Sequence, residues 1–320
     1  MEVAIGSPLP RPGGPPFLID GGLETCLIFR DGFELPSFAS FVLLDDARGR
    51  AALDAYYRGF LDIAALTGAG FVLDSPTWRA SPDWGAALGY DRERLGAANR
   101  AAIALLAGLR DEYASIGPVV VNAAIGPRGD GYDPGQPMTA AEARDYHRWQ
   151  LAQVAEAGAD MATALTMTNV EEAEGIAAAA REVGIPLAVS FTVETDGCLP
   201  TGMALAEAVA RIEDRHGDAV AYYMVNCAHP SHFADVLDDD LLRARVGGIR
   251  ANASRMSHAE LDEAEGLDDG NPQEFAGDYR GLMDALPNLC VLGGCCGTDH
   301  RHVAAIAETC VPQLKLRAYP

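Results

Sequence analysis

Short apolar runs recur along the chain, and stretches in which apolar residues repeat with helical spacing separate them. Residues 51–67 are an example of the second kind, because Leu53, Tyr57 and Phe60 fall on one face of a helix. The apolar runs have the length of strands. The expected strands are 17–20, 71–74, 118–122, 161–165, 186–191, 219–225, 246–249 and 289–292. The expected helices are 51–67, 91–113, 139–157, 170–183, 202–213, 231–237, 272–286 and one that begins with Thr298 as its cap.

Strict alternation of strand and helix is typical of a parallel sheet, because each helix carries the chain back to start the next strand. Eight such units fit a closed (β/α)8 TIM barrel, in a single domain, better than an open sheet. We assign the barrel to residues 17–314. Residues 1–16 are rich in proline and are expected to be a loose lead-in, and residues 315–320 a short tail.

Polar residues stand where several of the expected strands end, including Asp20, Asp74, Asn122 and Asn226. The carboxyl ends of the strands in a (β/α)8 barrel meet at one rim, and the loops that follow them build the active site. We therefore expect these side chains to share one site.

Composition narrows the function classes. A net charge of −22 argues against binding to nucleic acid or to anionic membranes, both of which require basic patches. The sequence has no uncharged apolar window of about 18 residues, which predicts no membrane span. Its N-terminus lacks the layout of a signal peptide. Seven cysteines in no regular framework indicate a reducing cytoplasm with free or metal-binding thiols. The sequence leaves monomer and homo-oligomer open.

Two adjacent cysteines, Cys295 and Cys296, lie between glycines where the last expected strand meets its helix. A catalytic zinc site takes three protein ligands and keeps one position open, so a third thiol has to come from elsewhere. Cys227 has the same context, at the end of the strand expected at 219–225. The competing interpretation is that all three are ordinary buried thiols, since free cysteine is often buried.

These motifs resemble those of the homocysteine S-methyltransferase family, over nearly the whole chain. The run from Asp20 to Thr25 is similar to the opening motif of the family, and residues 125–129 to its Gly-Pro loop. Residues 225–227 and 293–298 resemble its two zinc motifs. The family fold is a (β/α)8 barrel, in agreement with the pattern of strands and helices.

The resemblance implies a Zn2+ site formed by Cys227, Cys295 and Cys296, with an open position for the thiol of a small amino acid. Zinc deprotonates a coordinated thiol, and the thiolate is the nucleophile. The implied reaction moves a methyl group from a small cationic donor, a sulfonium or ammonium compound, to homocysteine and gives methionine.

Substrate contacts follow from the same resemblance. Asp20 matches a carboxylate that contacts the amino group of homocysteine, and Thr25 belongs to the same motif. Asn226 and Asn252 match asparagines at the rim of the barrel. Each of these residues has a structural alternative, because Asp and Asn side chains also satisfy backbone groups in turns.

Two segments depart from the family pattern. Leu165 stands where the family usually has a glutamate, and it cannot hold an ammonium group, so a different small thiol is an alternative acceptor. In residues 74–81, we hypothesise that Trp78 faces the cationic donor and that Arg79 holds a substrate carboxylate. The alternative places Trp78 in the core and makes Arg79 a surface charge.

Two other functions compete with methyl transfer. One is a zinc hydrolase on the same barrel, which three thiolates disfavour because they lower the Lewis acidity of the metal. The other is a non-enzymatic or redox protein in which Cys295 and Cys296 form a vicinal disulfide and bind no metal.

Overall fold

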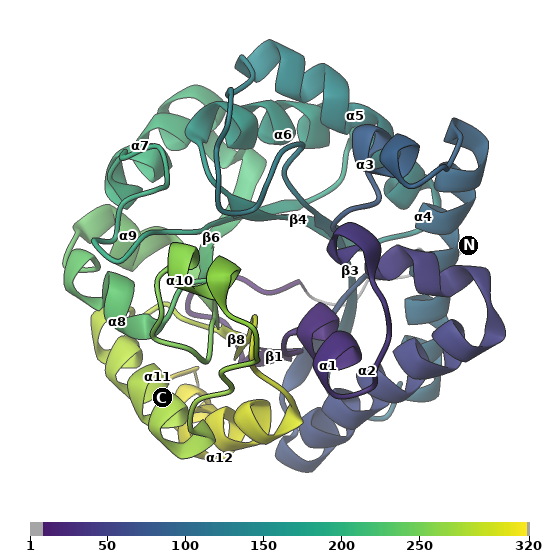
Figure 1. Ribbon diagram of the computed structural model, residues 1–320. Coiled ribbons are helices and arrows are strands. Elements are labelled where there is room, and N and C mark those ends of the chain that lie inside the picture. The colour runs from purple at the N-terminus through teal and green to yellow at the C-terminus, as the bar shows by residue number, and fades with distance from the viewer. Residues whose placement is uncertain (1–8, 319–320) are drawn as a thin grey trace, which may run out of the picture.

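In the computed structural model, which describes residues 9–318, eight parallel strands close into a barrel in chain order, and helices surround it (Figure 1). The strands are β1 (Phe17–Ile19), β2 (Gly70–Asp74), β3 (Val119–Ile125), β4 (Met161–Met167), β5 (Leu187–Phe191), β6 (Val220–Asn226), β7 (Val246–Ala251) and β8 (Val291–Gly294). The predicted single-domain (β/α)8 barrel is confirmed.

The longer helices each follow one strand and cover the outside of the barrel. They are α2 (Ala47–Thr67), α4 (Arg92–Glu112), α5 (Ala140–Glu156), α6 (Val170–Val183), α7 (Leu205–His216), α11 (Pro272–Ala285) and α12 (His300–Ala318). Shorter helices lie in the loops: α1 (Leu23–Phe29), α3 (Pro82–Ala87), α8 (Pro230–Phe233), α9 (Asp240–Arg245) and α10 (His258–Glu263). Single 3₁₀ turns occur at Pro36–Phe38, Ser40–Asp45, Gly217–Ala219 and Ala234–Val236.

Large side chains fill the interior of the barrel. Met161, Tyr222 and Met224 point inward and are almost completely buried, together with Phe17 and Val291. The barrel is therefore a packed core and not a pore, as is usual for this fold. Only the end at which the strands finish is left for a ligand.

Capping residues set several of the helix ends. Thr139 and Glu142 form a reciprocal capping box at the start of α5, and Gly184 ends α6 in the left-handed conformation. The prediction that Thr298 caps the last helix is wrong. Asp299 accepts a hydrogen bond from the Arg301 N–H at 2.8 Å, whereas the Thr298 hydroxyl donates back to the Cys295 carbonyl at 2.7 Å.

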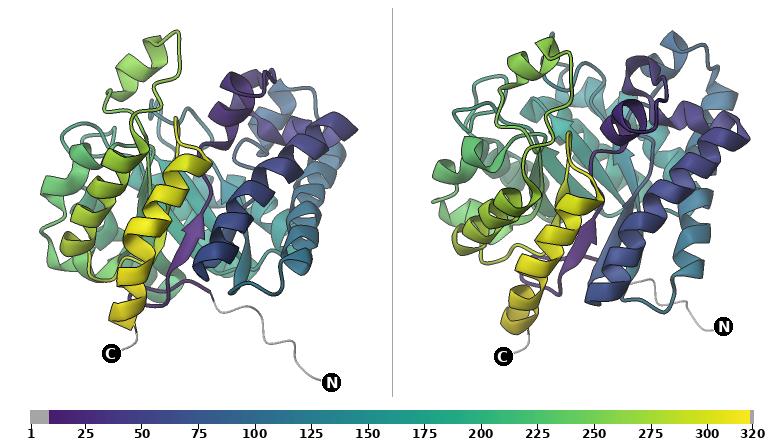
Figure 2. Two further views of the ribbon diagram at one scale, coloured as in Figure 1. Left: turned by 90° about the horizontal axis from the view of Figure 1, so that it is seen from below. Right: turned by 60° about the horizontal axis from the view of Figure 1, so that its bottom comes forward.

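The helices α1, α3 and α10 are short and were not expected from the sequence. Six or seven residues contain too few turns to show a periodic pattern. Figure 2 shows α1 and α10 standing above the carboxyl ends of the strands, at the end of the barrel opposite to the last residues of α12. They form the walls of the site described below.

The segment before β1 and the end of the chain can be described only in part, because residues 1–8 and 319–320 lie outside the described residues. The part of the expected lead-in that is described runs along the barrel, where the Gly13 N–H donates to the Asn288 carbonyl. Helix α12 continues to Ala318, into the expected tail. Residues 9–318 contain no helix with the length and apolar character that a membrane crossing requires.

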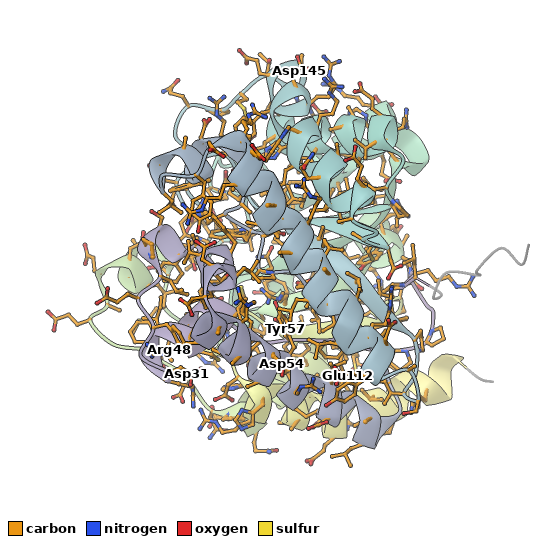
Figure 3. The ribbon with its side chains drawn as sticks, turned by 90° about the vertical axis from the view of Figure 1, so that its right-hand side faces the viewer. Asp31, Arg48, Asp54, Tyr57, Glu112 and Asp145 are labelled. Carbon is orange, nitrogen blue, oxygen red and sulfur yellow. The ribbon has the colours of Figure 1, made fainter. Side chains whose placement is uncertain are left out.

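The helix α2 connects the outer surface of the barrel to the site. On its outer side Arg58 pairs with Asp54 and with Glu112 of α4, and Figure 3 shows Asp54 and Glu112 on this side of the molecule. On its inner side the Tyr57 hydroxyl donates to the Asp74 carbonyl at 2.7 Å. The tyrosine thereby fixes the last residue of β2.

A buried carboxylate on α6 holds the loop that follows β3. Glu172 accepts hydrogen bonds from His147 Nε2 at 2.8 Å and from the Arg128 N–H at 2.7 Å. Burial alone would raise the pKa of Glu172, but its hydrogen bonds and the nearby His147 lower that pKa below the ordinary value. The charged form is therefore stabilised by the folded state.

We expect Glu172→Gln to reduce the free energy of unfolding by roughly 3 kcal/mol at neutral pH, because the buried partners lose their anion. A carboxylate with a lowered pKa stabilises the fold above the ordinary pKa of 4.5, and this contribution is lost as the pH falls below that value. The difference between the two proteins should therefore shrink in acid. Denaturant unfolding at pH 7 and pH 4 measures both effects.

Glu171→Gln is the matched control, since Glu171 is one-third exposed and pairs with Arg211 at the surface. It should cost less than about 1 kcal/mol. Equal losses in the two variants would contradict the assigned role of Glu172.

Candidate metal centre

A cavity of about 490 Å3 lies at the carboxyl end of the strands. Residues at the ends of β1, β2, β4, β6, β7 and β8 form its floor, and α1, the loop at 130–132 and the segment 261–268 form its walls. Besides the three cysteines, the sequence predicted six residues that bind substrate. Asp20, Thr25, Trp78, Arg79 and Asn252 line the cavity.

The three predicted metal ligands converge on the floor of this cavity. The sulfur atoms of Cys227, Cys295 and Cys296 all lie within 4.8 Å of one another. Tetrahedral zinc with bonds of about 2.3 Å would place its thiolate sulfurs about 3.8 Å apart. The spacing and the type of the three donors therefore fit a zinc ion.

The backbone places Cys227 in an uncommon conformation. Its φ is +54°, and Thr166 at the end of β4 has a φ of +62°, which is rare for a β-branched residue. Asn226 stabilises this arrangement, because its side chain accepts from the Thr166 N–H at 2.9 Å and donates to the Thr166 hydroxyl at 2.8 Å. Strained backbone that the surroundings enforce is typical of functional sites.

Close backbone approach explains the glycines around the other two cysteines. A Cβ on Gly294 would collide with Thr298, and Gly297 has a φ of +80°. The Gly297 N–H donates to the hydroxyl of Thr25 at 3.3 Å, which ties the turn to α1. Thr25 thus positions the cysteines as well as lining the cavity.

Electrostatics separates the three thiols. The pKa of Cys295 is lowered well below its ordinary value, because the thiols of Cys227 and Cys296 donate hydrogen bonds to it. The pKa of Cys227 is raised for the reciprocal reason. Of the three thiols, Cys295 is therefore the one whose thiolate form the surroundings favour. A metal cation would replace the remaining protons.

Arg250 is a central residue of the site that was missed in the sequence. It is buried at the floor, where Nη2 donates to Asp20 Oδ1 at 2.7 Å and Nη1 lies 3.6 Å from the sulfur of Cys295. Its Nε is 3.7 Å from Asp74 Oδ2. A charged residue inside an apolar strand was the available signal, since such a residue requires buried partners.

The surroundings shift the pKa values of the two carboxylates beside Arg250, those of Asp20 and Asp74. Burial raises the pKa of Asp20 and raises that of Asp74 to about 7, and Arg250 opposes both shifts. The second oxygen of Asp20 accepts from the Tyr56 hydroxyl at 3.1 Å. Both carboxylate oxygens of Asp20 are therefore already bonded within the protein.

Trp78 and Arg79 form part of a stack at the cavity wall. The guanidinium of Arg79 lies between the rings of Trp78 and Trp84, 4.0 and 3.9 Å from their centroids. Its Nη1 donates to the Gly129 carbonyl at 2.7 Å, and only 5% of the residue is exposed. Arg79 is thus not a surface charge. One face of Trp78 is occupied by this cation, so a contact with the donor would involve the remainder of its ring.

The two predicted asparagines have different positions. Asn252 lies at the cavity, and its Nδ2 donates to the Cys227 carbonyl at 2.9 Å. Asn226 does not line the cavity, and its hydrogen bonds hold Thr166 and Ser190. Its geometry supports a positioning role.

Tyr132 was missed because it lies in a loop with no periodic pattern, and His258 begins α10. His258 Nε2 is 2.9 Å from the Cys227 carbonyl, and its ring stacks on Tyr132 with centroids 3.9 Å apart. The Tyr132 hydroxyl lies 3.9 Å from the sulfur of Cys296. Tyr132 lines the cavity beside Cys296, and His258 supports the Tyr132 ring and the Cys227 backbone.

The fold and the site define a (β/α)8 barrel with three convergent thiols at its carboxyl rim, a group that could hold a metal ion. The family model described as homocysteine S-methyltransferase matches residues 17–310, and the chain is therefore a member of the homocysteine S-methyltransferase family.

Relatives and solved structures agree with this assignment. Homocysteine S-methyltransferase 2 of Arabidopsis thaliana is 26% identical over 210 residues, which are 62% of each chain. Homocysteine S-methyltransferase 3 of Zea mays is 27% identical, and the match spans 59% of its length. The chain thus spans about 60% of these two relatives. Selenocysteine Se-methyltransferase of Brassica oleracea var. italica is 25% identical over 93% of this chain and 90% of its own.

The fold is shared with homocysteine methyltransferase MmuM from Escherichia coli. Its oxidised form superposes with a TM-score of 0.74 at 20% identity, over 92% of this chain and 95% of that chain. The metallated form gives 0.72 at 21% identity, over 92% and 96%.

We expect Arg250→Gln to destabilise the protein by roughly 3–5 kcal/mol, because two buried carboxylates lose their counter-ion. Adding Asp20→Asn should restore part of this loss. Denaturant unfolding of the single and double variants, in the same metal state, measures both effects. Arg255→Gln is the control, because Arg255 is 61% exposed and should change stability by less than about 0.5 kcal/mol. An unchanged Arg250→Gln protein would refute the role of the ion group.

Proposed function

We propose that the protein is a zinc-dependent S-methyltransferase that moves a methyl group from a cationic donor to the thiolate of homocysteine. The observation that carries this proposal is the convergence of Cys227, Cys295 and Cys296 on the floor of the cavity. Family membership supports the same chemistry. Zinc held by the three thiolates would act as a Lewis acid that favours the ionised form of an incoming thiol.

The bond changes require no nucleophile from the protein. A carbon–sulfur bond forms between the acceptor thiolate and the methyl carbon, while the bond from that carbon to the cationic donor atom breaks. The donor keeps the electron pair and leaves neutral, and the proton of the acceptor thiol is lost when its thiolate forms. The chain contributes by placing the two reactants in line and by keeping water out.

The cavity suits a cationic donor. Carboxylates of Asp20, Glu24 and Asp74 lie along it, and Arg79 and Arg250 are its two buried cations. With the three thiolates the balance is negative, which attracts a cation. The aromatic rings on the wall are apolar surfaces that a methylated cation can contact. These rings belong to Phe29, Phe38, Trp78, Trp84 and Tyr132.

A different small thiol or selenol is a second candidate acceptor. Leu165 lines the cavity and offers no charge to an amino group. The relative with the longest matched stretch is named selenocysteine Se-methyltransferase, so that protein is named for a shorter, selenium-containing acceptor. An acceptor panel should therefore contain cysteine and selenocysteine beside homocysteine.

The test combines zinc content with product analysis. Reduced, zinc-loaded protein meets each acceptor and a panel of sulfonium and ammonium donors, and mass spectrometry identifies the methylated product. We expect about one zinc per chain and methionine from homocysteine. Cys296→Ala removes a metal ligand and should lower zinc affinity and turnover by more than about 100-fold.

Cys198→Ala is the matched control, because Cys198 is a partly exposed thiol outside the cluster. It should retain both zinc and activity. If the protein binds zinc but forms product only from another acceptor, that compound would take the place of homocysteine as the proposed acceptor. A protein that binds no zinc, or whose turnover survives Cys296→Ala, would refute the mechanism.

A further inference from the structure

The two carboxylates at the floor of the cavity both face Arg250. Asp20 Oδ1 pairs with Arg250 and its Oδ2 with Tyr56. Asp74 Oδ1 accepts from Asn122 Nδ2, whereas its Oδ2 is buried without a hydrogen-bond partner and lies 3.7 Å from Arg250 Nε. An amino group at the floor would have to compete with a buried guanidinium for either residue. The acceptor needs another anion for its ammonium group.

Glu24 meets that requirement. It lies in the first turn of α1, four positions after Asp20, and lines the cavity. Its Oε1 accepts from the Ser40 hydroxyl at 2.7 Å, and among residues 9–318 its carboxylate forms no ion pair within 4 Å, although Arg250 acts on it at longer range. Burial raises the pKa of Glu24, so its charged form would be stabilised by a bound cation.

The backbone fixes Glu24 relative to the thiols. A Cβ on Gly22 would collide with the backbone of Cys295, so the start of α1 packs directly against the cysteine turn. The Thr25 hydroxyl accepts from the Gly297 N–H at 3.3 Å and gives this packing a second contact. A carboxylate on α1 is thus held at a set distance from the place where the acceptor sulfur reacts.

We propose that Glu24 is the residue that binds the ammonium group of the acceptor amino acid. The proposal rests on the methyl-transfer function above and deepens it. An ammonium group donates to a carboxylate in a charge-assisted hydrogen bond, whereas a sulfonium has no N–H to donate. Glu24 therefore selects the acceptor and not the donor. It supplies on α1 the negative charge that Leu165 does not supply on β4.

The experiment compares homocysteine with 4-mercaptobutanoate, which has the same thiol and carboxylate but no amino group. Calorimetric binding to the zinc-loaded protein and steady-state KM are measured for both acceptors. Glu24→Gln should weaken the binding of homocysteine by roughly 10- to 100-fold, because it removes a hydrogen bond to a charged group. It should change the affinity and the KM for 4-mercaptobutanoate by less than about twofold, and it should leave kcat at saturation nearly unchanged.

Two further variants serve as controls. Glu34→Gln, an exposed glutamate outside the cavity, should change neither acceptor. Ser40→Ala removes the partner of Glu24 but keeps its charge, so the preference for homocysteine should persist. If Glu24→Gln does not fold, the preference in Ser40→Ala still tests the proposal, and its loss there would count against it.

The overturning results are distinct. Equal weakening of both acceptors by Glu24→Gln, or an increase in the donor KM alone, would assign Glu24 another role. A selective loss of homocysteine in Asp20→Asn but not in Glu24→Gln would return the ammonium group to Asp20. A wild-type protein that binds zinc but methylates neither acceptor would instead refute the proposed function.

Discussion

A buried cation at the floor of the barrel is the interaction on which the rest of the site depends. Arg250 occupies a position in β7 where a core strand would ordinarily carry an apolar side chain, and it meets Asp20 from β1 and Asp74 from β2. Removing an ion from water costs several kcal/mol unless partners surround it, so these residues are stable only together. Their ion group joins β7 to β1 and β2 across the end of the barrel, and it places a positive charge 3.6 Å from Cys295.

The same ion group decides which charges remain for substrates. Arg250 offsets the carboxylates nearest to it, whereas Glu24 forms no ion pair within 4 Å in the part of the chain that the structure describes and feels Arg250 only at longer range. Arg250 also lowers the pKa of Cys295 and so favours a thiolate at that residue. One arginine thereby links the stability of the barrel floor to the chemistry above it. Arg250 therefore affects both the stability of the barrel and the charges in the cavity.

The sequence predicted the fold because periodicity is a local property. Eight apolar runs alternate with eight helical stretches, and the closure of the barrel follows from their number. Cys295 and Cys296 were visible because adjacent cysteines between glycines are rare, and Cys227 followed from ligand counting. Arg250 was not found, because its role comes from partners far away in the chain. Arg250 and Asp20 are separated by 230 positions, and no pattern in either segment names the other.

Positioning is the property that this architecture adds to the chemistry. Methyl transfer without a protein nucleophile depends on the placement of sulfur atoms, where small displacements are costly. Cys227 is held in a left-handed conformation by its neighbours: Asn226 fixes the facing Thr166, and Asn252 and His258 bind the Cys227 carbonyl. A closed barrel can maintain such a strained backbone, because each strand is hydrogen-bonded to a neighbour on both sides and its end cannot relax alone. These hydrogen bonds thus determine where the sulfur of Cys227 lies.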